Sequence, residues 1–199
     1  MDEGIDRLAT RRGLDRTVYD PAEDSGLLAT AVIDDVERAS YAIDVGTGSG
    51  YVAARIRGEI GVPVLGIDVN PHACLRAKEA GVPTIRGDLL TGIAADSADL
   101  VVCNPPYLPT EPEEERDDWL DTALSGGPTG RAIIDRLIPD LDRVLVEGGQ
   151  AYLLVSSLMD IDEVRETIRA HGFVASECDR DESFPFEVLV VLRLDRAGG

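Results

Sequence analysis

The sequence predicts an α/β fold, in which a mostly parallel sheet carries helices on both faces. Three observations support this fold class. Short apolar runs rich in Val, Ile and Leu alternate with stretches of helical period along most of the chain. The runs are apolar throughout, as in strands that a parallel sheet buries on both faces. A glycine-rich turn follows the first run, and α/β sheets bind their ligands beside such turns.

Length and composition bound the possibilities. A chain of 199 residues is long enough for one domain with a full core. We expect residues 1–18 to form a loosely ordered arm and residues 19–199 to form the folded domain. No apolar run approaches the roughly 18 residues of a membrane span, and the acidic N-terminus lacks a signal-peptide pattern. We therefore expect a cytoplasmic protein without a membrane partner.

The formal charge is −19, from 38 Asp and Glu against 19 Lys and Arg. Because nucleic-acid binding depends on Lys and Arg neutralising phosphates, this charge argues against a nucleic-acid partner. An Asp-rich surface with Lys78 as the one lysine is also typical of proteins that stay soluble in a salt-loaded cytoplasm. We favour this halophilic origin of the charge, and salt would then weaken partner arguments that rest on charge.

The sequence gives no sign of a metal site. Cys74, Cys103 and Cys178 are scattered without CxxC spacing, so neither zinc binding nor a disulfide framework is indicated. The acidic run 111–118 is interpreted as a solvated surface. We expect no bound metal.

The first helix is predicted to begin in the segment YDPAEDS, residues 19–25. Asp20 is the expected N-cap, Pro21 the first helical residue, and Glu23 the residue that closes a capping box. Apolar residues at helical spacing continue this helix to Val36.

The first predicted strand, residues 41–45, leads into a turn with glycines at 46, 48 and 50. Glycines permit a tight turn and close backbone approach, and the N-terminus of the next helix favours a negative group. Dinucleotide and S-adenosylmethionine sites share this signal, so it does not separate them by itself. Tyr51 stands where a third dinucleotide-site glycine would be expected, which favours S-adenosylmethionine.

The next two predicted strands, residues 64–68 and 82–85, also have acids at or after their ends. Asp68 closes the first of these strands, at a position where an acid accepts hydrogen bonds from ribose hydroxyls. Asp88 follows the second strand. Asn70 is the predicted cap of the helix between them.

The fourth predicted strand, Leu100–Cys103, ends in Asn104-Pro105-Pro106-Tyr107. Prolines cannot continue the strand pairing, and the residue before a proline stays extended. The side-chain carbonyl of Asn104 and the backbone carbonyl of Pro105 are two acceptors that suit a planar NH₂ group. Tyr107 adds a face for stacking. Alone, the segment could also be a strand end closed by a Pro-Pro turn.

The second half of the chain continues the alternation of strands and helices. Residues 110–130 are a long acidic loop that contains Trp119 and a run of small residues, and we expect a lid without regular structure. The remaining predicted elements are a helix at 131–146 that Gly148-Gly149 ends, a strand at 150–155, a helix at 160–170, and strands at 173–178 and 186–194.

Gly148-Gly149-Gln150 spells the tripeptide found at the tip of class I release factors. Because it follows a helix and opens a strand, we interpret it as a plain turn.

From Tyr19 to Leu194, the motifs YDPAEDS, IDVGTGSG, GIDVN, GDLL, NPPY and GGPTGR resemble the archaeal–eukaryotic branch of the HemK-type protein glutamine methyltransferases. NPPY matches the family's (N/D)PPY motif, and Ser25 stands where threonine is common. The resemblance implies a Rossmann-like class I methyltransferase with a seven-stranded, mostly parallel sheet and an antiparallel last strand. It implies transfer of a methyl group from S-adenosylmethionine to the N5 amide of the Gly-Gly-Gln glutamine in class I release factors.

The resemblance also implies a set of site residues. The cofactor-binding residues would be Ser25, Asp44, Gly46, Gly48, Asp68, Asp88, Leu89 and Asn104. The substrate-binding residues would be Asn104, Pro105, Pro106 and Tyr107, of which Asn104, Pro105 and Tyr107 would be catalytic.

The implied partner is a small zinc-binding activator protein. We expect it at the edge of the third strand, Val82–Ile85, next to the helix around Leu75. Two other functions fit the motif: adenine-N6 methylation of DNA or RNA, and cofactor binding without catalysis. The acidic surface and the missing recognition domain argue against the first, and the intact NPPY segment argues against the second.

Overall fold

The computed structural model describes residues 17–18, 20, 23–111, 113 and 119–198. Most of the predicted arm 1–18, the predicted first helical residue Pro21 and most of the acidic run 111–118 lie outside these residues. Among the described residues, the first helix is Glu23–Asp35. The predicted cap Asp20 pairs with Arg76, its carboxylate 2.5 Å from the guanidinium.

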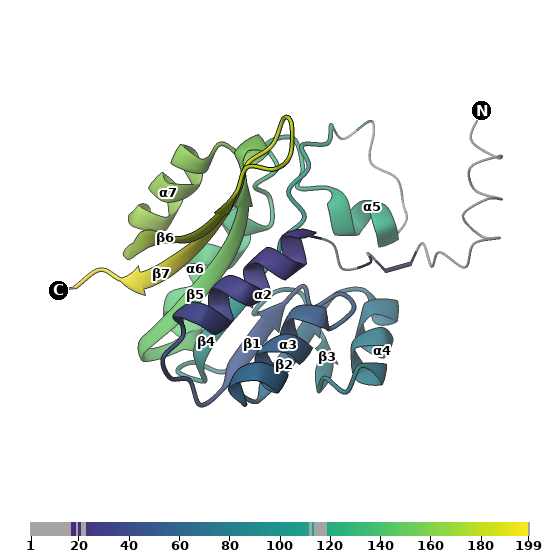
Figure 1. The fold of residues 1–199 in the computed structure, drawn as a ribbon, viewed down its shortest axis with the longest axis vertical. Helices are drawn as coiled ribbons and strands as arrows, with labels where there is room; N and C mark the ends of the chain where they lie inside the picture. The colour runs from purple at the N-terminus through teal and green to yellow at the C-terminus, as the bar shows by residue number, and fades with distance from the viewer. Residues whose placement is uncertain (1–16, 19, 21–22, 112, 114–118, 199) are drawn as a thin grey trace.

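One seven-stranded sheet with the order β3-β2-β1-β4-β5-β7-β6 forms the centre of the molecule (Figure 1). All neighbouring strands are parallel except that β7 runs antiparallel to both β5 and β6. The predicted fold class is therefore confirmed. The strands are β1 (Ala42–Val45), β2 (Val64–Asp68), β3 (Thr84–Arg86), β4 (Ala98–Cys103), β5 (Leu145–Ser156), β6 (Phe173–Asp181) and β7 (Leu189–Arg196).

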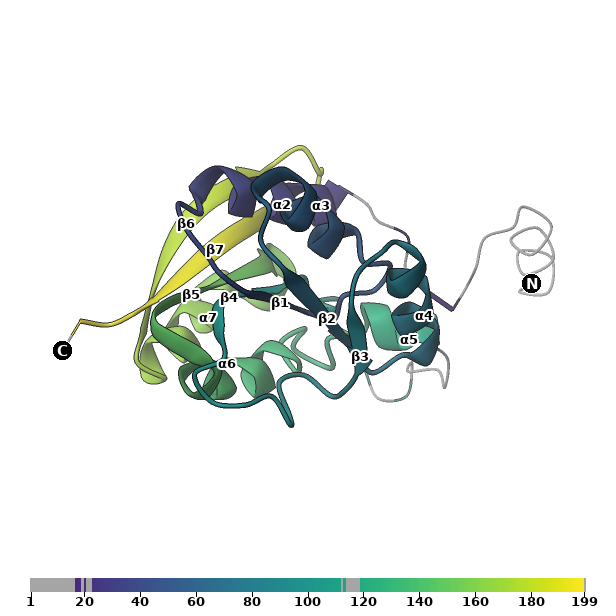
Figure 2. The same ribbon diagram turned by 90° about the horizontal axis from the view of Figure 1, so that it is seen from below.

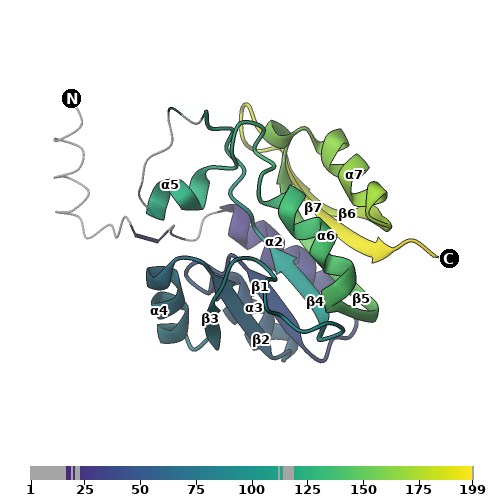
Figure 3. The same cartoon turned by 180° about the vertical axis from the view of Figure 1, so that it is seen from behind.

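Helices cover both faces of the sheet, as Figure 2 shows. Two of them, α6 and α7, lie on the face seen in Figure 3. Side chains of β4 alternate between the two cores, with Val101 packed on the α6 side and Leu100 and Val102 on the α2 side. The helices are α2 (Glu23–Asp35), α3 (Tyr51–Ile60), α4 (Pro71–Glu79), α5 (Trp119–Leu124), α6 (Ile134–Val144) and α7 (Ile161–Ala170), with a 3₁₀ turn η1 at Ser157–Met159. No helix among the described residues is long and apolar enough to cross a membrane.

The C-terminal end of α2 is fixed to the sheet by a polar cluster. The Asp35 carboxylate accepts hydrogen bonds from the Tyr152 hydroxyl at 2.7 Å and from the Arg193 guanidinium at 2.9 Å. Burial raises the pKa of Asp35, but these two bonds, the charge of Arg193 and a hydrogen bond from Cys178 together outweigh burial, and the net pKa is lowered. The ionised carboxylate therefore fixes α2 to β5 and β7.

Most strand boundaries differ from the prediction by a few residues, and two of the differences change an interpretation. Gly148 and Gly149 lie inside β5 and do not end a helix, so the interpretation of Gly148-Gly149-Gln150 as a plain turn was wrong. The pairing of β5 with β4 shifts there, since Ala98 pairs with Leu145 whereas Leu100 pairs with Gln150. Extra residues in one strand form an irregularity of the kind that glycine accommodates.

The predicted third strand also begins later, at Thr84. Val82 is only 2% exposed and packs in the α2-side core, while its N–H donates to the Ala77 carbonyl at 2.9 Å. β3 is nevertheless the edge strand, as predicted.

Candidate active site

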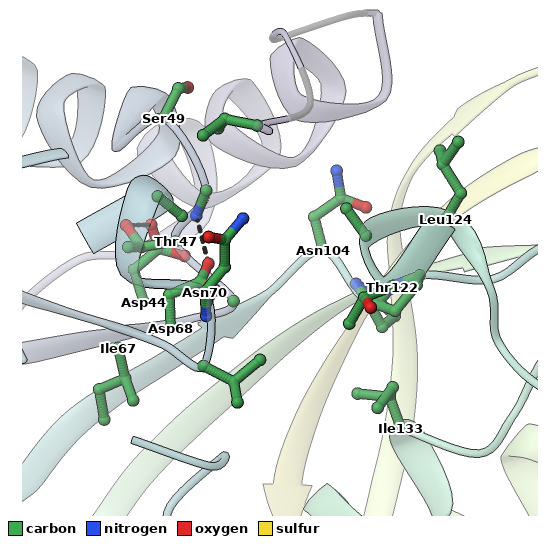
Figure 4. A pocket seen from close by; sticks show the side chains of 18 of the residues that line it. Asp44, Thr47, Ser49, Ile67, Asp68, Asn70, Asn104, Thr122, Leu124 and Ile133 are labelled. Carbon is green, nitrogen blue, oxygen red and sulfur yellow. Dashed lines mark hydrogen bonds between the residues drawn. The ribbon is translucent and has the colours of Figure 1, made fainter. Parts of the chain in front are cut away.

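A cavity of about 280 Å³ opens at the carboxyl ends of β1, β2 and β4 (Figure 4). β1 has β2 on one side and β4 on the other, so the strand order reverses here, where α/β sheets bind ligands. All the residues that the sequence assigned to the site line this one cavity: Ser25, Asp44, Gly46, Gly48, Asp68, Asp88, Leu89, Asn104, Pro105, Pro106 and Tyr107.

The glycine turn after β1 packs directly on β2. Gly46 and Gly48 have φ angles of 72° and 53°, which residues other than glycine rarely adopt. A Cβ atom on Gly66 of β2 would lie 2.8 Å from the Cγ2 atom of Thr47 in the turn. Glycine at positions 46, 48 and 66 therefore allows the turn to line the cavity and to pack closely against β2.

Asp44 is a buried carboxylate beneath this turn. Its side chain is 2% exposed, and its Oδ2 accepts a hydrogen bond from the Thr47 hydroxyl at 2.7 Å. Burial raises the pKa of Asp44 to about 6. A cationic group in the cavity would stabilise the ionised form of this carboxylate.

Asp68 at the end of β2 connects the turn to α4. Its Oδ2 accepts from the Gly48 N–H at 2.9 Å, and its Oδ1 accepts from the Asn70 N–H at 2.8 Å. Burial raises the pKa of Asp68, and these backbone bonds partly oppose the rise. Because each carboxylate oxygen has about two acceptor sites, both oxygens can still accept from a ligand hydroxyl.

Replacing Asp68 by alanine should weaken cofactor binding by about 10- to 150-fold, because lost charge-assisted bonds amount to about 1.5–3 kcal/mol. A contact made equally in the ground and transition states changes KM and leaves kcat nearly constant. Calorimetry and steady-state kinetics would measure both quantities. Asp162→Ala, at an exposed acid of α7, is the matched control. Unchanged affinity for the cofactor would contradict the assignment of Asp68.

The segment after β3 brings Asp88 and Leu89 to the rim. The half-exposed Asp88 carboxylate accepts a hydrogen bond from the Arg136 guanidinium at 2.6 Å. Leu89 has φ of 50°, a conformation that costs roughly 1–2 kcal/mol for a residue with a Cβ atom. Such strain persists where the surrounding structure requires it, and here it accompanies a leucine that lines the cavity.

Asn104 stands between two groups of cavity residues, as Figure 4 shows. Its Nδ2 donates to the Asp24 carboxylate and to the Ser25 hydroxyl, both at 3.2 Å. Its Oδ1 is buried and has no hydrogen-bond partner among the described residues. A buried acceptor left without a donor costs roughly 1–3 kcal/mol, so a ligand N–H at this position would remove a penalty.

The cavity has a polar part and an apolar part. Asp44, Asp68 and Asn70 belong to the first, and Leu124 and Ile133 belong to the second, on the far side of Asn104 (Figure 4). A polar ligand can therefore lie on one side of Asn104 while a less polar segment of a second ligand lies on the other.

The apolar part is covered by α5, within a loop that we had expected to lack regular structure. Leu108 donates its N–H to the Leu124 carbonyl at 3.1 Å and accepts from the Gly126 N–H at 2.9 Å. The structureless-loop prediction was therefore wrong for this part of the loop, because backbone bonds fasten the end of α5 to the segment after NPPY.

The run of small residues after α5 fits closely against that segment. A Cβ atom on Gly130 would lie 2.5 Å from the Tyr107 carbonyl oxygen. Gly126 is equally restricted, because its Cβ would collide with the Gly130 backbone. The ring of Tyr107 packs against both cores at this point.

Sequence reasoning missed several cavity residues. Asp24 is buried, but its local sequence predicts only an ordinary acidic residue in the first turn of a helix. Asn70 is the predicted cap, since its Oδ1 accepts from the His72 N–H at 2.9 Å, but its Nδ2 also donates to the Thr17 carbonyl at 2.6 Å. That bond holds the buried Val18 over the cavity, and no local pattern predicts it.

The fold and the site define an S-adenosylmethionine-dependent methyltransferase. The cavity fits this cofactor, because Asp44 can face a cation, Asp68 can accept from ribose hydroxyls and Leu89 offers an apolar surface for adenine. Within the described residues, no group of three or more His, Cys, Asp or Glu side chains is arranged to hold a metal.

Comparison with known proteins identifies the branch of this class. Residues 43–106 match the methyltransferase domain family. A protein N5-glutamine methyltransferase of Methanocaldococcus jannaschii is 35% identical over 181 residues, covering 88% of this chain and 90% of its own. Methyltransferase HEMK2 of Mus musculus is 33% identical over 175 residues, covering 81% and 82%. The chain belongs to the protein N5-glutamine methyltransferase family.

A solved structure agrees with this assignment. The E. cuniculi Mtq2-Trm112 complex, responsible for the methylation of the eRF1 translation termination factor, matches with a TM-score of 0.73 and 28% identity. The match covers 91% of this chain and 99% of that chain.

Proposed function

We propose that this protein transfers a methyl group to the N5 side-chain amide of the glutamine in the Gly-Gly-Gln motif of a class I release factor. The observation that carries the proposal is the buried Asn104 Oδ1 without a donor. A glutamine amide N–H would supply the missing donor. The relationship to a complex that methylates a termination factor supports this choice of substrate. Such a substrate implies work in the cytoplasm.

The side chains would act mainly by positioning. The amide nitrogen is a weak nucleophile, because its lone pair is delocalised. Asn104 Oδ1 and the Pro105 carbonyl would accept its two hydrogens, and Tyr107 would flank the amide plane. Bound S-adenosylmethionine supplies an electrophilic methyl group on a sulfonium. Orientation of this kind can contribute about 7–11 kcal/mol to lowering a barrier.

Adenine-N6 methylation remains the competing enzymatic function, since an exocyclic NH₂ suits the same two acceptors. The formal charge of −19 opposes nucleic-acid binding. A cofactor-binding subunit without catalysis would not need an unpaired acceptor on Asn104, between the polar and the apolar part of the cavity.

Incubation with methyl-labelled cofactor would separate these functions. We expect label on the release-factor glutamine and none on duplex DNA or RNA, and a Gly-Gly-Gln→Gly-Gly-Ala substrate is the control. The assay should run at low and high salt, because the acid-rich composition is typical of salt-adapted proteins. Label on DNA alone would overturn the proposal.

We also propose that a small zinc-binding activator protein binds the β3 edge. Three apolar side chains are exposed there: Val69 at 43%, Leu75 at 61% and Ile85 at 43%. Val82, which we had expected on this surface, is buried and cannot contribute. An edge strand with apolar neighbours can pair with a strand of another chain.

Replacing Ile85 by aspartate should weaken the activator complex by about tenfold or more, since a charge would enter an apolar contact. Cofactor affinity should stay within about twofold, because Ile85 does not line the cavity. Size-exclusion chromatography of the pair at high salt would measure the effect. Val174→Asp, on the opposite edge strand β6, changes a side chain that is 54% exposed and is the matched control. Equal losses in both variants would contradict a β3 interface.

A further inference from the structure

The direction of the Asn104 amide decides whether the cavity offers an acceptor or donors. With Nδ2 toward α2, the buried Oδ1 points to the side of Thr122 and Leu124 (Figure 4) and is left without a donor, so it can accept from a substrate N–H. Turned by 180°, the same side chain would present two N–H groups to the N–H groups of the substrate. The groups on α2 therefore select between a binding orientation and a repelling one.

Of the two α2 groups that touch Asn104, only one can make this selection. The Ser25 hydroxyl is 3.2 Å from Nδ2, and a hydroxyl can donate or accept, so it satisfies either orientation. The Asp24 carboxylate, also 3.2 Å from Nδ2, accepts only. Turning the amide would place Asn104 Oδ1 against a carboxylate oxygen.

Asp24 is itself held in place. It is 5% exposed, and its Oδ1 accepts from the Ser25 N–H at 2.6 Å, which leaves Oδ2 for Asn104. The other end of the same helix is fixed by Asp35 through Tyr152. The carboxylate is therefore buried, with one oxygen bonded to its own helix and the other to Asn104.

We propose that Asp24 is a positioning residue for methyl transfer: it fixes the Asn104 amide with Oδ1 toward the substrate. The charge-assisted bond also polarises the amide and strengthens Oδ1 as an acceptor. This inference rests on the proposed function, because it concerns the same acceptor.

Asp24→Asn gives the sharpest test. The Ser25 N–H requires an acceptor, so the new amide should keep its oxygen there and turn its NH₂ toward Asn104. Asn104 would then turn its Oδ1 toward α2 and present donors to the substrate. We expect kcat to fall about tenfold or more, with cofactor affinity within about threefold. Glu23→Gln, at the exposed neighbouring acid, should leave both unchanged.

A reversal variant tests orientation directly. Combining Asp24→Asn with Asn104→Asp restores a donor on α2 and an acceptor facing the cavity. The double variant should be about fivefold or more faster than Asp24→Asn alone. A wild-type kcat in Asp24→Asn, or no recovery in the double variant, would overturn the proposal.

A third readout does not depend on any substrate. Asn70 and Asn104 are the chain's two asparagines, so ¹⁵N-asparagine labelling gives two side-chain amide signal pairs. Asp24→Ala should shift the Asn104 pair and leave the Asn70 pair in place. If wild-type protein fails to methylate the release factor, the proposed function falls, and this shift alone decides whether Asp24 holds Asn104. An unmoved Asn104 pair would overturn the proposal.

Discussion

Replacing Asn104 by alanine should lower kcat for glutamine methylation by about 100-fold or more, roughly 2.7 kcal/mol in activation free energy. The variant removes the unpaired acceptor Oδ1, which we expect to act mainly at the reacting nitrogen. Cofactor affinity should fall much less, because the polar part of the cavity around Asp44 and Asp68 stays intact.

Single-turnover kinetics and calorimetry would separate these two effects. Asn104→Leu keeps the approximate size of the side chain without an acceptor, so it should lose as much activity as alanine does. If leucine restored turnover, the role of Asn104 would be packing. If cofactor binding disappeared while turnover at saturating cofactor persisted, Asn104 would be a cofactor ligand and its proposed role would be wrong.

The second large effect concerns Asp44 and the pH dependence of stability. Between pH 4 and pH 7, the free energy of unfolding of the wild-type protein should fall by about 2 kcal/mol relative to Asp44→Asn. Burial raises the folded-state pKa of Asp44 from 3.8 to about 6. The folded carboxyl keeps its proton in this range while the unfolded one loses it. The contribution is therefore full only well below the unfolded pKa of 3.8 and is lost as the pH rises through about 6.

Chemical denaturation of the cofactor-free protein at several pH values would measure this difference, with exposed Asp34→Asn as control. Parallel stability curves for wild type and Asp44→Asn would contradict the prediction. Binding of a cationic group beside Asp44 should also make the Asp44 carboxyl release its proton near pH 6. Calorimetry in two buffers with different ionisation enthalpies would detect that release, which Asp44→Asn should abolish.

The sequence was most informative about the side chains at strand ends, because the direction of parallel strands is enough to determine where those side chains lie. Asp44, Asp68, Asp88 and Asn104 lie in or just after four strands that run in parallel. Parallel strands end at the same edge of a sheet, so local strand predictions were sufficient to bring these side chains into one cavity. Their individual roles stay predictions.

Features set by long-range contacts could not be predicted in this way. Asp20 forms an ion pair with Arg76, 56 residues away, which its local sequence does not indicate. Val82 looks like an edge residue in its own segment, yet it packs beside Ala77 in the core. Asp24 has the appearance of any first-turn acid until Asn104, 80 residues later, is placed beside it.

The position of Gly148-Gly149-Gln150 bears on automethylation. We propose that the protein methylates this tripeptide in a release factor, and the same tripeptide occurs in its own chain. Gln150 pairs in register with Leu100, four residues before Asn104 and therefore roughly 13 Å back along the strand. Its amide nitrogen donates to the Asp195 carboxylate at 2.7 Å, and its strand lies between β4 and β7. The folded enzyme thus withholds its own glutamine from itself and from other copies, and methyl-Gln150 would mark only molecules whose β5 had left the sheet.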